Sequence, residues 1–276
     1  MNRPAKLVRL SRARSRVKRA ATRKLKPQLV AAIEQLHDRF FASSGLAPYR
    51  EGALPVLPLL RERALRSDEL AHIQAAVEAM AADALKDALE RAMQTMYVAG
   101  QDSAFKELGD AAPEPGSMLR VHSRALKSID AYTAKLSDTV IDRERDVVLD
   151  LVRDAVSEGW TIDELAEQIQ AAFADGVHVG GNEDARVIAT GDWAEMVART
   201  EVSRAHNAGA IDLYRAAGGE KMEFIAAEDE RMCDECGDLD GQTFALDDEE
   251  GTPPIHPECR CCTALRSKAA ASSEDE

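Results

Sequence analysis

Apolar residues recur every three or four positions along most of this chain, which is the period of an α-helix. The clearest stripe lies between residues 119 and 140, and a second pattern of this kind covers about 59–108. A run rich in Pro and Gly, residues 109–117, separates the two. The pattern predicts two long helices that pair in an antiparallel hairpin or take part in a bundle.

The N-terminal part carries a separate signal at Pro27. Proline favours the first turn of a helix, so we expect Pro27 to open a second helix with Leu29, Ile33 and Phe40 on its apolar side. Residues 43–58 contain three Pro and two Gly, which predicts a connector.

The C-terminal half shows shorter elements. Thr161 and Glu164 stand at capping-box spacing and predict a helix that continues to about Ala174. A further helix is expected from near Asp192 to Ala217.

Two short apolar runs, residues 221–227 and 241–246, are typical of strands on either side of the first cysteine pair. The glycine-rich run 176–182 lacks the spacing of a phosphate-binding motif, so we interpret it as a loop.

Composition excludes several classes of protein. Among 276 residues, 45% are hydrophobic but only 4% are aromatic, which disfavours an all-β sandwich or barrel. No apolar run approaches the length of about 18 residues that a membrane-spanning helix needs, so we expect no membrane association. The basic N-terminus is not followed by an apolar segment and therefore does not resemble a secretory signal.

Charge is distributed unevenly. Residues 1–33 contain eleven Lys or Arg and no Asp or Glu, whereas the net charge of the whole chain is −14. Within this arm one helical stripe is spaced 3, 4, 3, 4 and 3 residues apart, and it consists of Arg9, Arg12, Arg16, Arg19, Arg23 and Lys26. Because these charges repel one another, we expect an isolated arm to fray until an anionic partner, such as DNA or an acidic protein surface, neutralises it. A solvated helix or a disordered tail is the alternative.

All five cysteines lie between residues 233 and 262. Cys233 and Cys236 form one pair, and His256 and Cys259 form a second pair with the same internal spacing. Four such ligands suit tetrahedral Zn²⁺, with Cys261 as the alternative to His256. A disulfide or redox-variable cluster and inert thiols remain alternatives. A catalytic zinc is disfavoured, because four protein ligands leave no open position.

The predicted fold is therefore mainly α. Long N-terminal helices are followed by a small α+β C-terminal module with a short β-hairpin and a zinc knuckle.

Residues 147–265 resemble the phage head morphogenesis family of Mu F-type minor head proteins. The resemblance rests on ordered pieces rather than on a single motif. These pieces are residues 158–169, the helix with Arg199, Thr200, Glu201 and Asn207, the segment with Asp229, Arg231, Cys233 and Cys236, the segment with Leu239, Asp240, Gly241 and Phe244, and residues 253–261. We interpret Arg199, Thr200 and Glu201 as structural residues, because charged side chains on an amphipathic helix commonly anchor neighbouring turns.

The resemblance implies a minor structural protein of a tailed-phage or prophage head, without enzymatic activity. Such a protein acts in head morphogenesis and in DNA packaging or delivery, with copies arranged around the portal. The implied partners are the portal protein, capsid or scaffold proteins and packaged DNA. The implied location is the capsid interior at the portal vertex, and the host cytoplasm during assembly.

We divide the chain into a basic helical arm (1–33), a long-helix region (34–145), the Mu F-type module (146–265) with its Cys/His cluster at 233–262, and an acidic tail (266–276). Two other functions compete with the structural one. A zinc-dependent enzyme acting on DNA lacks a HExxH motif or a defensible catalytic pairing. A nucleic-acid-binding regulator could use the arm, although the acidic remainder of the chain opposes the approach of DNA.

Overall fold

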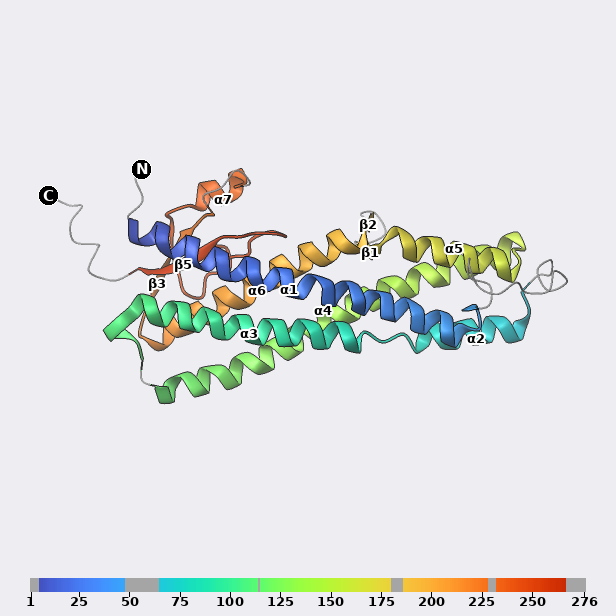
Figure 1. Cartoon of the computed structure of the whole chain (residues 1–276), viewed down its shortest axis with the longest axis horizontal. Helices are drawn as coiled ribbons and strands as arrows, with labels where there is room; N and C mark the ends of the chain where they lie inside the picture. Colours follow the sequence, from blue (N-terminus) through green and yellow to red (C-terminus); the bar gives the residue numbers. More distant parts are fainter. Residues whose placement is uncertain (1–4, 48–64, 114, 180–185, 228–231, 267–276) are drawn as a thin grey trace. The chain divides into compact units, whose positions relative to one another are not determined.

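The computed structural model describes residues 5–47, 65–113, 115–179, 186–227 and 232–266 (Figure 1). Most of the expected connector and the tail from residue 267 onward lie outside the described residues. The chain is mainly helical with short antiparallel strands in its C-terminal part, as predicted. The helices are α1 (Ala5–Ser44), α2 (Ser67–Glu78), α3 (Asp83–Leu108), the 3₁₀ helix η3 (Gly109–Ala111), α4 (Pro115–Glu158), α5 (Ile162–Asp175), α6 (Thr190–Ala216) and α7 (Asp234–Leu239). Among the described residues, no helix has the length and apolarity needed to cross a membrane.

The chain forms two compact units, each assembled from separate stretches. Unit 1 contains Met1–Lys26, Leu89–Tyr132 and Glu195–Glu276, and unit 2 contains Pro27–Ala88 and Thr133–Ala194. Helices α1, α3, α4 and α6 contribute residues to both units. The division that we made along the sequence, at residues 33, 145 and 265, stays a prediction.

Helix α1 continues through Pro27, so the expected start of a second helix at this proline is wrong. A proline inside a helix removes one hydrogen bond and costs about 3 kcal/mol. Leu25, Leu29, Ile33 and Phe40 are nevertheless buried on both sides of it. Each such side chain contributes about 1.5–3 kcal/mol on burial, which outweighs the local penalty.

The helical pattern of residues 59–108 contains a break that sequence periodicity did not reveal. Helix α2 ends at Glu78 and α3 begins at Asp83. The Arg145 guanidinium, on α4, donates hydrogen bonds to the carbonyl oxygens of Val77 (3.1 Å), Glu78 (3.2 Å) and Met80 (2.7 Å). A cation that satisfies the last carbonyls of a helix stabilises its C-terminus. The break is thus fixed by a side chain more than 60 residues away.

The core of unit 2 consists of large apolar side chains. Phe40, Phe41 and Phe173 meet edge to face, and the His37 ring stacks on Phe173 with ring centroids 3.9 Å apart. Helix α5, which carries Phe173, begins as predicted. The Thr161 hydroxyl accepts the Glu164 N–H, and the Glu164 carboxylate accepts the Thr161 N–H. The same unit contains an antiparallel hairpin of β1 (Val177–Val179) and β2 (Arg186–Ile188), where we expected only a loop. Three-residue strands are too short to show an alternating pattern.

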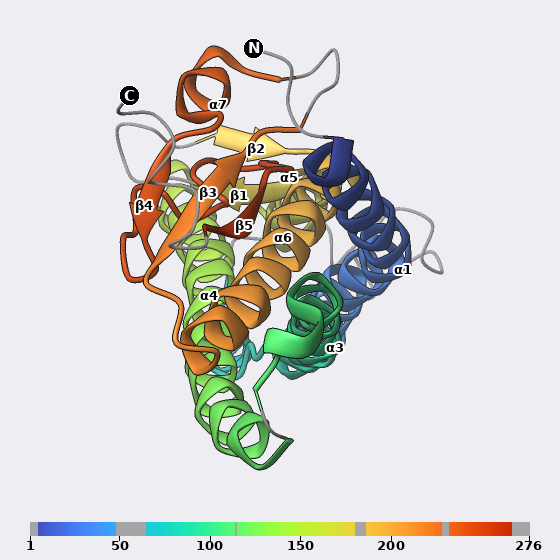
Figure 2. The same cartoon turned by 90° about the vertical axis from the view of Figure 1, so that its left-hand side faces the viewer.

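Unit 1 contains a three-stranded antiparallel sheet in the order β4-β3-β5. The strands β3 (Lys221–Ile225) and β4 (Thr243–Ala245) were predicted, and β5 (Cys262–Arg266) was not. Figure 2 shows α6 beside this sheet. Ala210, Leu213 and Tyr214 of α6 share an apolar cluster with Met222 of β3.

Helices α3 and α6 approach each other closely in unit 1. A Cβ added to Gly100 would lie 2.0 Å from the His206 carbonyl oxygen, and one added to Gly209 would lie 2.0 Å from the Tyr97 carbonyl oxygen. Only glycine at both positions allows this backbone contact.

Candidate metal centre

The first cysteine pair lies at the beginning of α7. Cys233 is the N-cap residue of this helix, and its Sγ accepts a hydrogen bond from the Cys236 N–H at 3.4 Å. The short helix therefore turns the chain so that the Cys236 thiol faces the same space as the Cys233 thiol. The Cys236 side chain is buried and the Cys233 side chain is half-buried.

The second pair lies on the loop before β5. The His256 Nδ1–H donates to the Pro257 carbonyl oxygen at 2.7 Å, which leaves Nε2 as the nitrogen with a free lone pair. A backbone partner of this kind fixes the tautomer and the ring orientation of metal-binding histidines. Nε2 lies 3.2 Å from the Cys233 Sγ and 3.1 Å from the Cys236 Sγ.

Side chains of helix α6 hold the loop before β5 in place. The Thr200 hydroxyl accepts the Glu258 N–H at 2.8 Å, and Arg199 forms ion pairs with Glu258 and Glu195. Deeper along the helix, the buried Asn207 side-chain amide donates to the carbonyl oxygens of Pro253 (3.1 Å) and Cys261 (3.2 Å). Arg199, Thr200 and Asn207 thus position the loop that carries His256 and Cys259. This geometry agrees with the structural interpretation of Arg199 and Thr200.

Two overlapping groups of side chains could each hold a metal ion. One is Cys233, Cys236 and His256, and the other is Cys236, Cys259 and Cys261. Cys236 belongs to both groups, and its Sγ lies 3.9 Å from the Cys259 Sγ. Two sulfur ligands on one tetrahedral zinc are separated by about 3.8 Å, given Zn–S bonds of about 2.3 Å. The separation of the Cys236 and Cys259 sulfurs therefore fits two ligands of one zinc ion.

The structure brings all four predicted ligands, and the alternative ligand Cys261, into one cluster. The choice between His256 and Cys261 as the fourth ligand stays a prediction. All five cysteines are free thiols in this structure. Asp229 and Arg231, which belong to the resemblance, lie outside the described residues.

The surroundings of the cluster favour thiolates at some positions. The hydrogen bond from the Cys236 N–H is the largest influence that lowers the pKa of Cys233. The Cys261 thiol and backbone N–H groups lower the pKa of Cys259 to about 5. Burial, with the nearby Cys259, raises the pKa of Cys236 to about 12. Burial alone would lower the pKa of His256, but its bond to the Pro257 carbonyl and the neighbouring thiols raise it overall. Thiolates are the form that binds metal.

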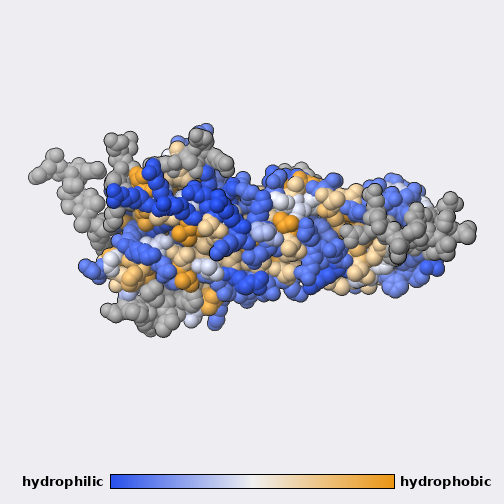
Figure 3. Space-filling model, viewed as in Figure 1, coloured by the Kyte–Doolittle hydropathy of each residue, from blue (hydrophilic) through white to orange (hydrophobic). Residues whose placement is uncertain are grey.

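Five of the six basic residues in the predicted stripe are exposed, and the sixth, Lys26, is half-buried and forms an ion pair. The side chains of Arg9, Arg12, Arg16, Arg19 and Arg23 are exposed along α1, whereas Lys26 forms an ion pair with Glu195 at 2.8 Å. Figure 3 shows hydrophilic side chains gathered over the N-terminal half of α1. We call the five exposed arginines the basic ridge.

The opposite side of α1 carries two buried cations that sequence reasoning missed. Arg14 donates to the Thr263 carbonyl oxygen on β5, to the Glu107 carboxylate at 2.9 Å and to the Tyr214 hydroxyl at 2.8 Å. Lys18 Nζ donates to the Ser203 hydroxyl at 3.0 Å and to the Cys261 carbonyl oxygen at 2.7 Å. The N-terminal half of α1 is therefore a packed helix of unit 1 and not a separate arm, while the fraying of an isolated arm stays a prediction. Arg14 and Lys18 are spaced at helical intervals from the buried Ser11 and Leu25, and this spacing could have indicated that they lie on the buried side of the helix.

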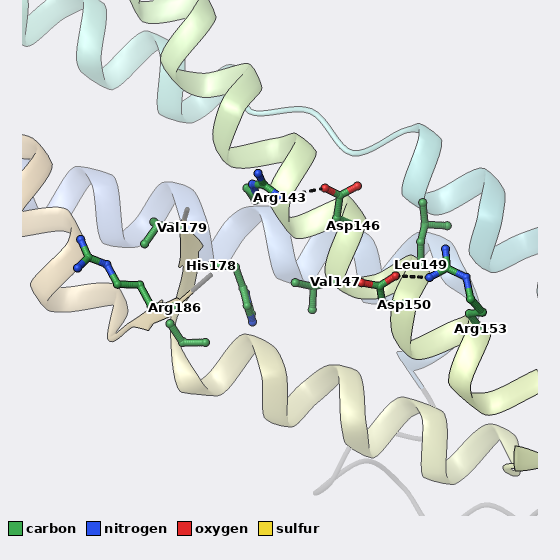
Figure 4. Close-up of a pocket in the computed structure, with 10 residues that line it drawn as sticks. Arg143, Asp146, Val147, Leu149, Asp150, Arg153, His178, Val179 and Arg186 are labelled. Atoms are coloured by element: carbon green, nitrogen blue, oxygen red, sulfur yellow. Dashed lines mark hydrogen bonds and ion pairs between the residues drawn. The ribbon is translucent and has the colours of Figure 1, made fainter. Parts of the chain in front are cut away.

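A second feature lies within unit 2. A cavity of about 500 Å³ is lined by α4 and the β1–β2 hairpin (Figure 4). Its acidic residues are engaged by arginines three residues away, Arg143 with Asp146 and Arg153 with Asp150. His178, which lines the cavity, lies close to the buried Glu144 carboxylate, with 3.5 Å between its Nδ1 and the Glu144 Oε1. The second carboxylate oxygen, Oε2, lies 3.4 Å from the His37 Nε2.

Comparison with known proteins gives a family for the C-terminal part of the chain. Neither the curated proteins nor the solved structures contain a match to this chain. Residues 146–264 match the family described as "Phage Mu protein F like protein". The resemblance proposed from the ordered motifs is thereby confirmed for this segment, which supports a phage head-related protein. Residues 146–264 are a phage Mu protein F-like module.

Proposed function

We propose that this chain is a minor structural protein of a tailed-phage or prophage head, located at the portal vertex and without enzymatic activity. The observation that carries the proposal is the Mu F-like module at residues 146–264. The contacts of Arg199, Thr200 and Asn207 support a structural role for these residues, because all three hold the loop before β5 in place.

Within this protein the Cys/His cluster serves as a structural zinc site. Cys233, Cys236, His256 and Cys259 would hold the ion, with Cys261 as the alternative to His256. When bound, zinc supplies a crosslink between α7 and the loop before β5. The supporting observations are the ligand separations of 3.1–3.9 Å and the fixed His256 tautomer.

The basic ridge would contact packaged DNA, while other surfaces contact the portal, capsid or scaffold proteins. Five exposed arginines follow one side of α1. None of the aromatic residues of the chain lies among the first 39 positions, so contacts would be made to phosphates and would be insensitive to base sequence.

The location is tested in assembling heads. Heads are purified from cells that produce the full chain with a small tag, and from cells in which its gene is disrupted. We expect the tagged protein to co-purify with heads, and cryo-EM of the vertices to show additional density at the portal only when the protein is present. Absence of the protein from purified heads, or uniform labelling of the whole shell, contradicts the proposal.

The DNA contact is tested with the full chain, because removing α1 would also remove Arg14 and Lys18 from unit 1. Replacing Arg9, Arg12 and Arg16 by Gln removes three exposed charges. If each makes one phosphate contact, the slope of log K against log salt should fall by about 0.9 per charge removed. Replacement of three exposed lysines elsewhere, Lys106, Lys127 and Lys135, by Gln changes the net charge by the same amount and is the control. An unchanged salt slope in the arginine variant contradicts a role for the ridge.

A further inference from the structure

A hollow lies beside the basic ridge, between α1, α6 and the segment before β5, all within unit 1. Its volume is about 210 Å³. The lining residues are Ser15, Lys18, Arg19, Thr22, Arg23, Glu195, Arg199, Ser203, Cys259 and Arg260. We propose that this hollow binds a phosphate group, carried either by a DNA backbone or by inorganic phosphate.

The charge of the lining is strongly positive. Five of its ten residues are cationic, and Glu195 is the one carboxylate. Glu195 is already engaged, because its two oxygens form ion pairs with Lys26 and Arg199. Arg19 and Arg23 stand one helical turn apart, so both guanidinium groups reach the same side of α1. An anion that enters the hollow therefore meets several cations and no free carboxylate.

The burial and the hydrogen bonds of Lys18 distinguish the hollow from a surface that is merely basic. Its side chain is only 6% exposed, and both of its hydrogen-bond acceptors, the Ser203 hydroxyl and the Cys261 carbonyl oxygen, are uncharged. Within the described part of the chain, no carboxylate lies at ion-pair distance from it. An ammonium group has three N–H donors, and the Ser203 hydroxyl and the Cys261 carbonyl oxygen use two of those of Lys18. Among the described residues the third has no acceptor, so it can donate to an anion in the hollow.

The donors in the hollow suit phosphate better than other anions. Arginine side chains bind phosphate oxygens with paired N–H groups, and the hydroxyls of Ser15 and Ser203 add further donors. No aromatic residue is among the ten that line the hollow, so nothing there stacks on a base. The ligand is therefore a phosphate group and not a nucleobase.

The inference deepens the proposed DNA contact and rests on it only for the source of the phosphate. The ridge by itself predicts that each exposed arginine contributes equally to DNA binding. The hollow instead predicts that Arg19 and Arg23 contribute more than Arg9 and Arg12, which have the same exposure class but do not line it.

The first experiment uses inorganic phosphate alone. Isothermal titration calorimetry at low ionic strength compares the wild-type chain with the double variant Arg19→Gln/Arg23→Gln and with the matched control Arg9→Gln/Arg12→Gln. We expect the affinity for phosphate to fall about tenfold or more in the first variant and to stay within about twofold in the control. Equal binding by all three proteins, or no binding by any, overturns the inference.

Lys18→Met removes the buried amine and is expected to abolish phosphate binding. Because this variant could also fail to fold, its circular dichroism is measured first, and the two surface double variants decide the question in any case.

The second experiment identifies the source of the phosphate with a short DNA duplex. If DNA enters the hollow, inorganic phosphate competes with the duplex, and Arg19→Gln/Arg23→Gln loses more affinity than the control. If the two double variants lose DNA affinity equally while neither binds phosphate differently, the hollow is excluded and the ridge stands. If phosphate binds in the hollow but no variant changes DNA binding, the site takes free phosphate and the DNA function fails instead.

Discussion

The two compact units are stabilised by different kinds of interaction. Unit 2 has an apolar core in which Phe40, Phe41 and Phe173 are surrounded by aliphatic side chains of α2, α4 and α5. Unit 1 also contains apolar clusters, but its C-terminal part is organised by the buried Arg14 and Lys18 and by a cluster of thiols.

The two units should therefore differ in how far amino-acid substitutions lower their stability. Apolar burial is non-directional, so a core of the unit 2 kind loses stability in proportion to the area removed. Buried charges and metal ligands are directional, and the loss of one partner leaves the others buried and unsatisfied. We therefore expect substitutions in unit 1 to have larger and more specific effects than comparable substitutions in unit 2.

The largest effect is expected from Cys236→Ser. Cys236 belongs to both candidate ligand groups, so this change should abolish metal binding and with it a binding free energy of about 10 kcal/mol or more, as is usual for structural zinc. Residues 221–266 should lose chemical-shift dispersion in NMR spectra, while the signals of the Phe173 core remain. Metal content is measured by elemental analysis of protein made under reducing, chelator-free conditions.

Cys262→Ala is the matched control. Cys262 is buried on β5 beside Leu7 and Leu10 and belongs to neither ligand group, so this variant should keep its metal. Wild-type protein without any bound zinc contradicts the metal site. Loss of metal in Cys261→Ser but not in His256→Gln leaves the site intact and changes the fourth ligand to Cys261.

The next largest effect is expected from Arg14→Met. This substitution keeps an unbranched stem but removes the guanidinium group, which leaves Glu107 and the Thr263 carbonyl oxygen without their cation. Breaking a buried ion pair in this way costs about 3–5 kcal/mol, which chemical denaturation measures directly. Arg12→Met, an exposed position on the same helix, should change the free energy of unfolding by less than about 0.5 kcal/mol. Similar values for the two variants would mean that the buried network does not stabilise unit 1.

A smaller effect is expected where α3 and α6 touch. Gly209→Ala forces a methyl group against the Tyr97 carbonyl oxygen, and overpacking of this kind costs about 1–3 kcal/mol. Gly191 lies in the same helix but in the unit 2 stretch, with open space around it. Gly191→Ala should therefore be neutral or raise the melting temperature slightly. Equal destabilisation by both changes would contradict the close contact as the cause, because alanine favours a helix more than glycine does at either position.

An effect of similar size, which depends on pH, is expected at Glu144, a buried carboxylate of unit 2 that two histidines flank. Burial by itself raises the pKa of Glu144, but the contacts with His178 and His37 lower it to about 2. A carboxyl group whose pKa falls on folding stabilises the protein above its ordinary pKa, and this contribution disappears as the pH falls from about 4.5 to about 2. Glu144→Gln should flatten the pH dependence of unfolding in this window and cost about 1–3 kcal/mol at neutral pH.

Asp138→Asn, at an exposed position of the same helix, is the control and should leave the curve unchanged. If wild type and Glu144→Gln lose stability in parallel between pH 4.5 and 2, Glu144 is not the group responsible.

Local signals in the sequence predicted most of the helices. The three-to-four spacing from residue 119 onward corresponds to α4, and the Thr161–Glu164 capping box begins α5. The spacing within the two Cys/His pairs was sufficient to identify the candidate metal ligands, because residues three apart in a turn present their side chains to one point. These features depend on neighbours within a few residues.

The sequence by itself determined which segments are helical, which residues are candidate metal ligands and where positive charge accumulates, since each of these is encoded at short range. Only the tertiary structure decided that α1 continues through Pro27, that Arg145 ends α2, and that Arg14 and Lys18 are buried instead of joining the exposed ridge. The physical reason is that each outcome depends on partners distant in sequence. The carbonyl that Arg14 binds is 249 residues away, and no local pattern specifies such a contact.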